Sequence, residues 1–146
     1  MSIFYYNFVM NEMYNMGLSL HSIGAVAILA VIFVNLFILM SYNDLKKYKR
    51  LHSIVLWPTT FTILGLAIFT GTIMMAAKHL DFTLANIAMI IISIVYITLE
   101  AKRVKSLKYL NDKKEHAFNA YKPMARTILQ VEFLLIVLIS LWMWFL

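Results

Sequence analysis

Four long apolar runs constrain this chain more than any other feature of its sequence. They occupy residues 18–40, 53–77, 82–99 and 127–146. A helix needs about 20 apolar residues to cross the hydrocarbon core of a bilayer, and lipid offers no partner to unpaired backbone groups. The sequence therefore predicts four transmembrane helices, joined by loops at 41–52 and 100–126 and by a short turn at 78–81.

Composition agrees with a surface that faces lipid rather than water. Hydrophobic residues make up 62% of the chain, against about 45–50% in a typical soluble domain. Short connections favour antiparallel neighbours, and the turn at 78–81 predicts a tight hairpin of the second and third helices. We expect residues 1–146 to form a single all-α domain, an antiparallel four-helix bundle integral to the membrane. The absence of cysteine excludes disulfides, thiolate metal sites and cysteine nucleophiles.

The basic residues predict the orientation of the bundle. Of the 13 lysines and arginines, all except Lys78 lie in the two long loops. The positive-inside rule places both loops in the cytoplasm, so both termini lie on the other side. We therefore expect a multi-pass protein of the bacterial inner membrane. The loops face anionic lipid, so the bilayer is the expected partner and no nucleic acid is required. For a protein partner, the sequence leaves two alternatives, a second copy of the chain in a homo-oligomer or a membrane redox partner.

His21 is the histidine that lies deepest within a predicted span. Gly24 and Ala25 share its helical face. An imidazole beside small residues suits a haem ligand, because the macrocycle needs flat clearance next to the helix. The alternative is that small residues let two helices pack closely in lipid. His79, at the outer end of the second helix, is the second candidate ligand.

Methionines give a second pattern at the outer side. Met10, Met13 and Met16 repeat at every third residue, shortly before His21. Thioethers select Cu(I), and imidazole also accepts copper. A copper site formed by these methionines with His21 and His79 is therefore a hypothesis. The alternative is that methionine fills apolar gaps between helices.

Glu132 is the carboxylate that lies well inside a predicted span, and Asn35 lies at a similar depth. A carboxyl group in lipid is expensive, so it is expected to be protonated, paired with Arg126 or His52, or exposed to a wet cavity. Two roles stay open for the pair of residues: a proton-transfer step in redox or transport chemistry, or a hydrogen bond between Asn35 and Glu132 that fixes helix register. His52 and His116, in basic surroundings, are expected to be solvated or lipid-facing.

Three segments carry a resemblance to a known family. They are Leu20-His21-Ser22-Ile23-Gly24-Ala25-Val26, then Pro58 with Thr62, Gly65 and Gly71, and finally Arg126 before Glu132. They resemble the CopD-like superfamily, which includes HemJ-type protoporphyrinogen oxidases. The resemblance implies a b-type haem or porphyrin within the bundle, with His21 as ligand. HemJ-type proteins carry a lysine and a second histidine in the third helix, where this chain has neither, so the resemblance does not extend to the oxidase activity.

These observations leave three functional classes. The first is a redox-active membrane protein that binds haem b or a porphyrin at His21. The second is a copper-handling protein, for transport or resistance, that uses the outer Met/His cluster. The third is a non-catalytic membrane subunit or assembly factor.

Overall fold

The computed structural model describes residues 3–79, 81–114 and 116–145, and the elements found in them are helical. The helices are α1 (Ile3–Ser41), α2 (Leu45–Leu51), the π-helical turn η1 (His52–Leu56), α3 (Trp57–Ala77), α4 (Leu84–Lys108) and α5 (Ala117–Phe145). Because α2, η1 and α3 follow one another without a break, they form one long helix, Leu45–Ala77. The described residues thus contain four helices long and apolar enough to cross a membrane. The prediction of an all-α four-helix membrane bundle is confirmed.

The helices extend beyond the apolar runs. The segment before the first run is helical from Ile3, and most of the 41–52 loop is helix α2. Capping side chains determine where two of the helices begin. Asp44 accepts a hydrogen bond from the backbone N–H of Lys46 at 3.0 Å, and Thr83 accepts one from Asn86 at 3.2 Å. Apolar content marks the part of a helix that lies in lipid, whereas caps mark its ends.

A π-helical turn precedes Pro58. Proline has no backbone N–H, and its ring excludes the carbonyl four residues earlier, so the regular ladder cannot pass through it. The backbone N–H of Trp57 instead donates to the carbonyl of His52, five residues back. A wider turn of this kind is frequent at functional sites. Here it leaves His52 and Leu56 buried against the bundle.

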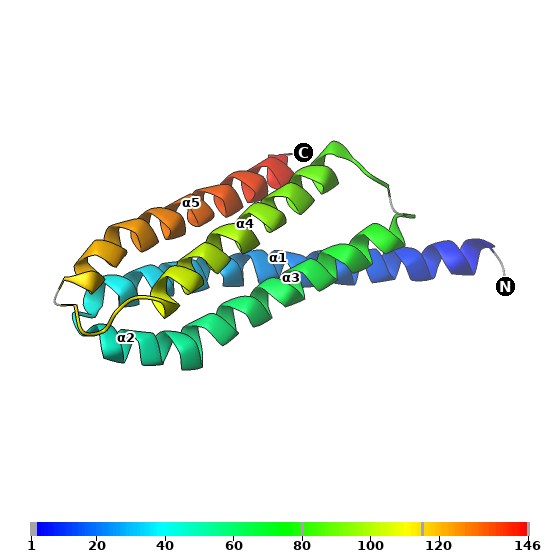
Figure 1. Cartoon of the computed structure of the whole chain (residues 1–146). Helices are drawn as coiled ribbons and strands as arrows, with labels where there is room; N and C mark the ends of the chain where they lie inside the picture. The colour runs from blue at the N-terminus through cyan, green and yellow to red at the C-terminus, as the bar shows by residue number, and fades with distance from the viewer. Residues whose placement is uncertain (1–2, 80, 115, 146) are drawn as a thin grey trace.

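The helices pack in the order α3–α1–α5–α4 (Figure 1), and α3 and α4 contact each other little although they are consecutive in the chain. The tight hairpin predicted for them is therefore wrong. A Cβ placed on Gly24 would lie 3.5 Å from the Cβ of Ala67, so α1 and α3 approach closely through small residues. The buried residues of α4 all lie at or after Tyr96. The half of α4 that precedes Tyr96 diverges from α3.

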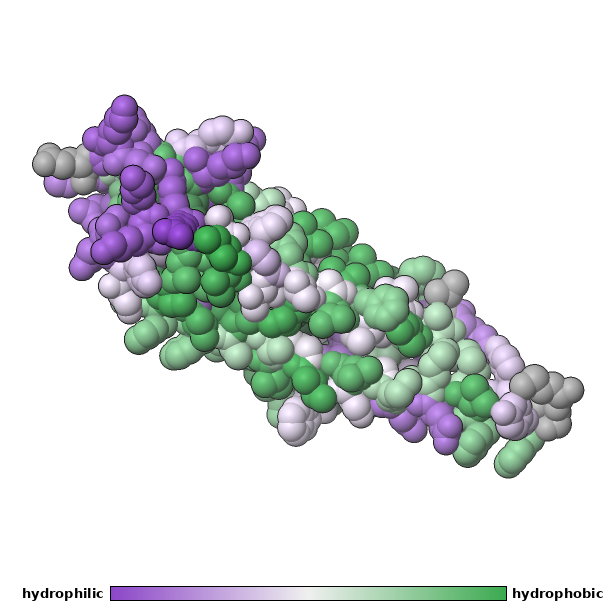
Figure 2. Space-filling model, turned by 90° about the horizontal axis from the view of Figure 1, so that it is seen from below, coloured by the Kyte–Doolittle hydropathy of each residue, from purple (hydrophilic) through white to green (hydrophobic). Residues whose placement is uncertain are grey.

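The two ends of the bundle differ in polarity. Figure 2 shows hydrophilic side chains gathered at one end and hydrophobic side chains along the middle. We name this hydrophilic end the basic end, and it carries the connection 42–44 and the described residues 109–114 after α4. Both chain termini lie toward the opposite end (Figure 1), which we name the terminal end. A polar end above an apolar middle is the surface expected of a membrane-spanning protein.

Candidate functional site: a buried polar cluster

The basic half of the bundle encloses a group of polar side chains that we name the polar cluster. Its members are Asn35 from α1, Tyr48 from α2, His52 from η1, Thr60 from α3, Tyr96, Glu100 and Arg103 from α4, and Tyr121 and Glu132 from α5. Each is at most 3% exposed. Burial of so many polar groups is costly unless they are paired. The hydrogen bonds and ion pairs among these side chains therefore indicate which chemistry the cluster can perform.

A buried ion pair lies at the centre of the polar cluster. The Arg103 guanidinium donates from Nε to Oε2 of Glu100 at 2.8 Å and from Nη2 to Oε1 at 2.5 Å. Both side chains are fully buried. The two residues are three apart on α4, so they share one face of the helix. A two-point contact of this kind is the strong form of an arginine–carboxylate pair.

The same guanidinium joins the other helices of the bundle. Its Nη1 reaches the Tyr48 hydroxyl and its Nη2 reaches Oδ1 of Asn35, both at 3.5 Å. The Tyr121 hydroxyl donates to the backbone carbonyl of Arg103 at 3.4 Å. Asn35 in turn donates to the Thr60 hydroxyl at 3.3 Å. Arg103 therefore links α1, α2, α4 and α5, and reaches α3 through Asn35.

Glu132 has no such partner. It is fully buried, and neither carboxyl oxygen receives a hydrogen bond from a donor in the described part of the chain. The carboxyl of Glu100 is an acidic neighbour that interacts electrostatically with Glu132. Two carboxylates cannot bond to each other without a proton. With Arg103 and Glu100 cancelling in charge, one added proton makes the cluster neutral and supplies the missing hydrogen bond.

The partners predicted for Glu132 from the sequence are wrong. Asn35 bonds to Thr60 and to the carbonyl of Val31, because the register of α1 against α3 directs its amide toward α3. Arg126 is exposed at the surface of α5. The Nε2 atom of His52 itself has no hydrogen-bond partner among the described residues.

His52 is also not solvated or lipid-facing, as its basic neighbours suggested. It is 3% exposed, and its ring lies 6.0 Å from that of Tyr48. The π-helical turn before Pro58 accounts for the difference, because it changes the direction in which the side chains of this segment point. His116 is exposed, as predicted.

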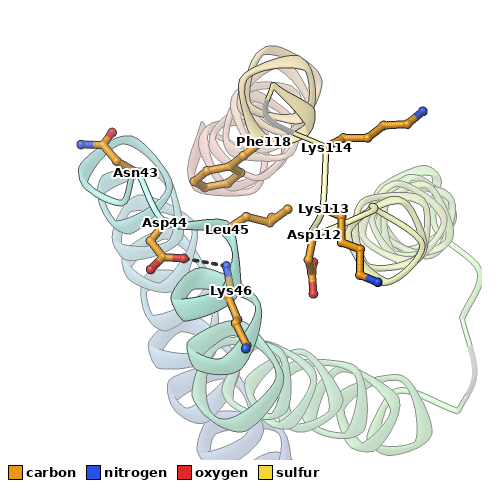
Figure 3. A pocket seen from close by; sticks show the side chains of 8 residues that line it. All are labelled: Asn43, Asp44, Leu45, Lys46, Asp112, Lys113, Lys114 and Phe118. Carbon is orange, nitrogen blue, oxygen red and sulfur yellow. Dashed lines mark hydrogen bonds between the residues drawn. The ribbon is translucent and has the colours of Figure 1, made fainter.

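Two hollows lie near the basic end. One is lined by Lys49, Arg50, His52, Ser53, Trp57, Val104, Leu107 and Lys108, and it lies between the η1 region and the end of α4. The other lies among the loops, and its lining includes side chains of both charge signs, the acidic Asp44 and Asp112 and the basic Lys46, Lys113 and Lys114 (Figure 3). In that second hollow Asp44 caps α2, and Asp112 pairs with Lys49 at 2.7 Å. Its acidic groups are therefore engaged in holding the loops.

His21 lies between α1 and α3, outside the polar cluster. Its Nδ1 is 2.9 Å from the carbonyl oxygen of Ala67 and 3.2 Å from the Thr70 hydroxyl. A carbonyl only accepts, so Nδ1 carries the proton and Nε2 keeps a lone pair. A Cβ on Gly71 would lie 3.3 Å from the ring, so glycine lets the imidazole approach α3. A metal-ligating histidine is commonly oriented by such a bond.

His79 is not brought together with His21. It is exposed in the turn after α3, at a φ of 56°, and its ring stacks on Tyr6 at 6.2 Å. Thr70, the neighbour of His21, is nine residues earlier, which is about 13 Å along a helix axis. The described residues therefore present His21 as a single ligand and not as half of a pair with His79.

The three methionines do not share one helical face. Successive residues turn by about 100°, so Met10 and Met16 point about 120° apart. Met10 and Met13 are half-buried, whereas Met16 is 63% exposed. Among the described residues, no group of three or more histidine, aspartate or glutamate side chains is placed to hold a metal ion. The copper site stays a prediction.

Comparison with known proteins adds no relative. No protein-family model, curated protein or solved structure matches the chain. The resemblance to the CopD-like superfamily therefore stays a prediction.

Sequence reasoning missed Arg103, Tyr48 and Tyr121, because they fall in segments that read as basic loops. A signal was present in the 96–107 segment. Tyr96, Glu100, Arg103 and Leu107 recur at helical spacing and form one buried face.

Proposed function

We propose that this chain is a proton-handling membrane protein, in which Glu132 and Glu100 share one exchangeable proton. The observation that carries the proposal is the fully buried carboxyl of Glu132, which receives no hydrogen bond from a donor in the described residues and has the carboxyl of Glu100 as an interacting neighbour. Such a proton serves a redox or transport step, which fits the role considered for Glu132 from the sequence. An ionisable group at this depth is retained at a cost, which favours function over packing alone.

A polar connection to the basic end supports the proposal. Arg103 reaches the Tyr48 hydroxyl, the Tyr48 ring lies beside that of His52, and His52 lines the hollow that opens between η1 and α4. Arg103 keeps its protons, so its role is to hold the carboxyl pair in place. The polar groups of the cluster lie in the basic half of the bundle, and we propose that the proton exchanges with that end.

Infrared spectroscopy of the purified protein tests the proposal. A protonated carboxyl gives its own C=O stretch, separate from that of a carboxylate, and this stretch shifts when the proton is replaced by deuterium. We expect the stretch to be present at neutral pH and to shift soon after transfer into heavy water. A stretch that stays unshifted for hours would make the proton a fixed structural element.

We also propose that the basic end faces the cytoplasm of a bacterial inner membrane, with both termini outside. The chain has no cysteine of its own, so single-cysteine variants report on each side. A membrane-impermeant maleimide on intact cells should label Ile3→Cys, and it should label Lys113→Cys only after permeabilisation. Labelling of Lys113→Cys alone in intact cells would reverse the orientation.

A b-type haem or porphyrin at His21 is the second candidate. The hydrogen bond from Nδ1 to Ala67 favours it, because the lone pair of Nε2 stays available. Since α3 covers the Gly24 side of the histidine, the macrocycle would approach from the half-exposed Ala25 side. Haem would supply one-electron chemistry there, and His21 would orient it.

The absorption spectrum tests the haem candidate. We expect a Soret band that is lost or shifted in His21→Ala. His79→Ala should leave it unchanged, because His79 lies apart from His21. Protein that is colourless when purified from haem-replete cells, and that stays colourless with added haemin, would exclude this candidate.

A further inference from the structure

The hollow between η1 and α4 has the composition of a site for an amphiphile. It has a volume of about 540 Å³ and is open on one side. Charged side chains stand at its rim, and Trp57, Val104 and Leu107 form its apolar wall. We name it the amphipathic cleft.

Two cations at the rim have no acidic partner among the described residues. Lys49 is engaged, because its ammonium binds Asp112 at 2.7 Å and donates to the carbonyl of Leu110 at 2.5 Å. Arg50 and Lys108 are both exposed, and no ion pair is formed by either. The rim therefore carries two cations from different helices that have no carboxylate partner among the described residues, with the ammonium of Lys108 5.9 Å from the centre of the Tyr109 ring.

The apolar wall continues toward lipid. Trp57 is 41% exposed at the start of α3, and an indole is favoured at the boundary between lipid and water. This wall lies between α3 and α4, two helices that contact each other little. A hydrocarbon chain can thus enter from the bilayer while a polar group stays at the basic end.

A polar atom within the lining lacks a partner. His52 lines the cleft and is 3% exposed, and its Nε2 makes no hydrogen bond within the described part of the chain. Buried polar atoms in native proteins are nearly always satisfied, so an orphan calls for a bound group or an ordered water.

We propose that the amphipathic cleft binds one anionic phospholipid from the bilayer. Its phosphate lies between Arg50 and Lys108, and one acyl chain runs along Trp57, Val104 and Leu107. Basic pockets between helices at the edge of a membrane bind phosphate headgroups in this way. The proposal is independent of the proton on Glu132.

Native mass spectrometry of the full chain, released from neutral detergent micelles, tests the proposal. The probe is dioleoylphosphatidylglycerol, with dioleoylphosphatidylcholine as the uncharged comparison. We expect one phosphatidylglycerol to be retained and phosphatidylcholine to be lost. Arg50→Ala/Lys108→Ala should weaken retention by roughly 25-fold, about fivefold for each basic residue.

Lys102→Ala/Lys105→Ala is the matched control, because it removes two exposed cations that do not line the cleft from the same end of α4. It should change affinity by less than about twofold, since without a bilayer there is no surface potential to act at a distance. Equal losses in the two double variants would overturn the proposal. Equal retention of phosphatidylcholine, or displacement of the lipid by inorganic phosphate, would also overturn it.

A photoactivatable group on the acyl chain locates the site without any substitution. With phosphatidylglycerol that carries a diazirine, we expect crosslinks in segments 53–57 and 104–107. Crosslinks confined to the terminal end would place the lipid elsewhere and overturn the proposal.

Discussion

Replacement of Arg103 by methionine should lower the free energy of unfolding by about 3–5 kcal/mol, the cost of removing one partner from a buried ion pair. Methionine approximates the length of the arginine stem, so the change chiefly removes charge and hydrogen bonds. Glu100 would then stay fully buried without its cation, and Tyr48 and Asn35 would lose a donor. Reversible unfolding in mixed detergent micelles measures the change.

The neighbouring Lys102→Met is the matched control for this prediction. Lys102 is exposed on the same helix and forms no ion pair in the described residues, so its replacement should change stability by less than about 0.5 kcal/mol. Adding Glu100→Gln to Arg103→Met removes the orphaned charge. The double variant should recover at least about 2 kcal/mol relative to Arg103→Met alone. A double variant that is no more stable than Arg103→Met would mean that the pair does not determine stability.

The spans could be predicted from the sequence because lipid imposes a simple rule on them. A run of apolar residues near the bilayer thickness must be a helix, whatever its neighbours do. The arrangement of the helices could not be predicted in the same way. The close contact of α1 and α3 depends on Gly24 meeting Ala67 and on His21 fitting beside Gly71. Those contacts depend on a register between segments that are about 45 residues apart, for which the sequence has no local signal.

The candidate site was predicted in part. Glu132 was identified because a carboxyl group in an apolar run is conspicuous. Arg103 was not identified as part of the site, because charged residues near a basic loop are usually solvated. It lies three residues after Glu100 on α4, so the two side chains share one buried face of the helix. His52 was missed for a related reason, because a single π-helical turn decides where its side chain points.

The polar cluster also explains why its chemistry lies in the basic half. Helices α1, α2 and α5 bond to Arg103 of α4 there, and α3 joins through Asn35. By contrast, α4 has no buried residue before Tyr96 among those described. Converging helices exclude water and lower the local dielectric, which strengthens the ion pair and makes an unpaired carboxyl costly. The same packing that stabilises the bundle therefore creates the need for a proton.

Glu132→Gln should remove the protonated-carboxyl stretch from the infrared spectrum completely while the fold is retained. The glutamine amide can donate to Glu100 without any added proton, and Arg103 keeps its bonds to Glu100. The polar cluster then carries no net charge, and the side chain at position 132 has a hydrogen-bond partner. The free energy of unfolding should therefore stay within about 1 kcal/mol of the original value. The spectrum and an unfolding titration of the same sample measure both quantities.

Glu12→Gln is the matched control, because Glu12 is an exposed carboxyl on α1 and its loss should leave the stretch intact. If the stretch survives in Glu132→Gln, the proton is not held by the pair and the proposed role fails. If the stretch disappears and any proton-coupled turnover of the protein continues at full rate, Glu132 is a structural residue. If Glu132→Gln loses both the infrared stretch and the proton-coupled turnover while its stability is unchanged, the moving proton belongs to the carboxyl pair that Arg103 holds in place.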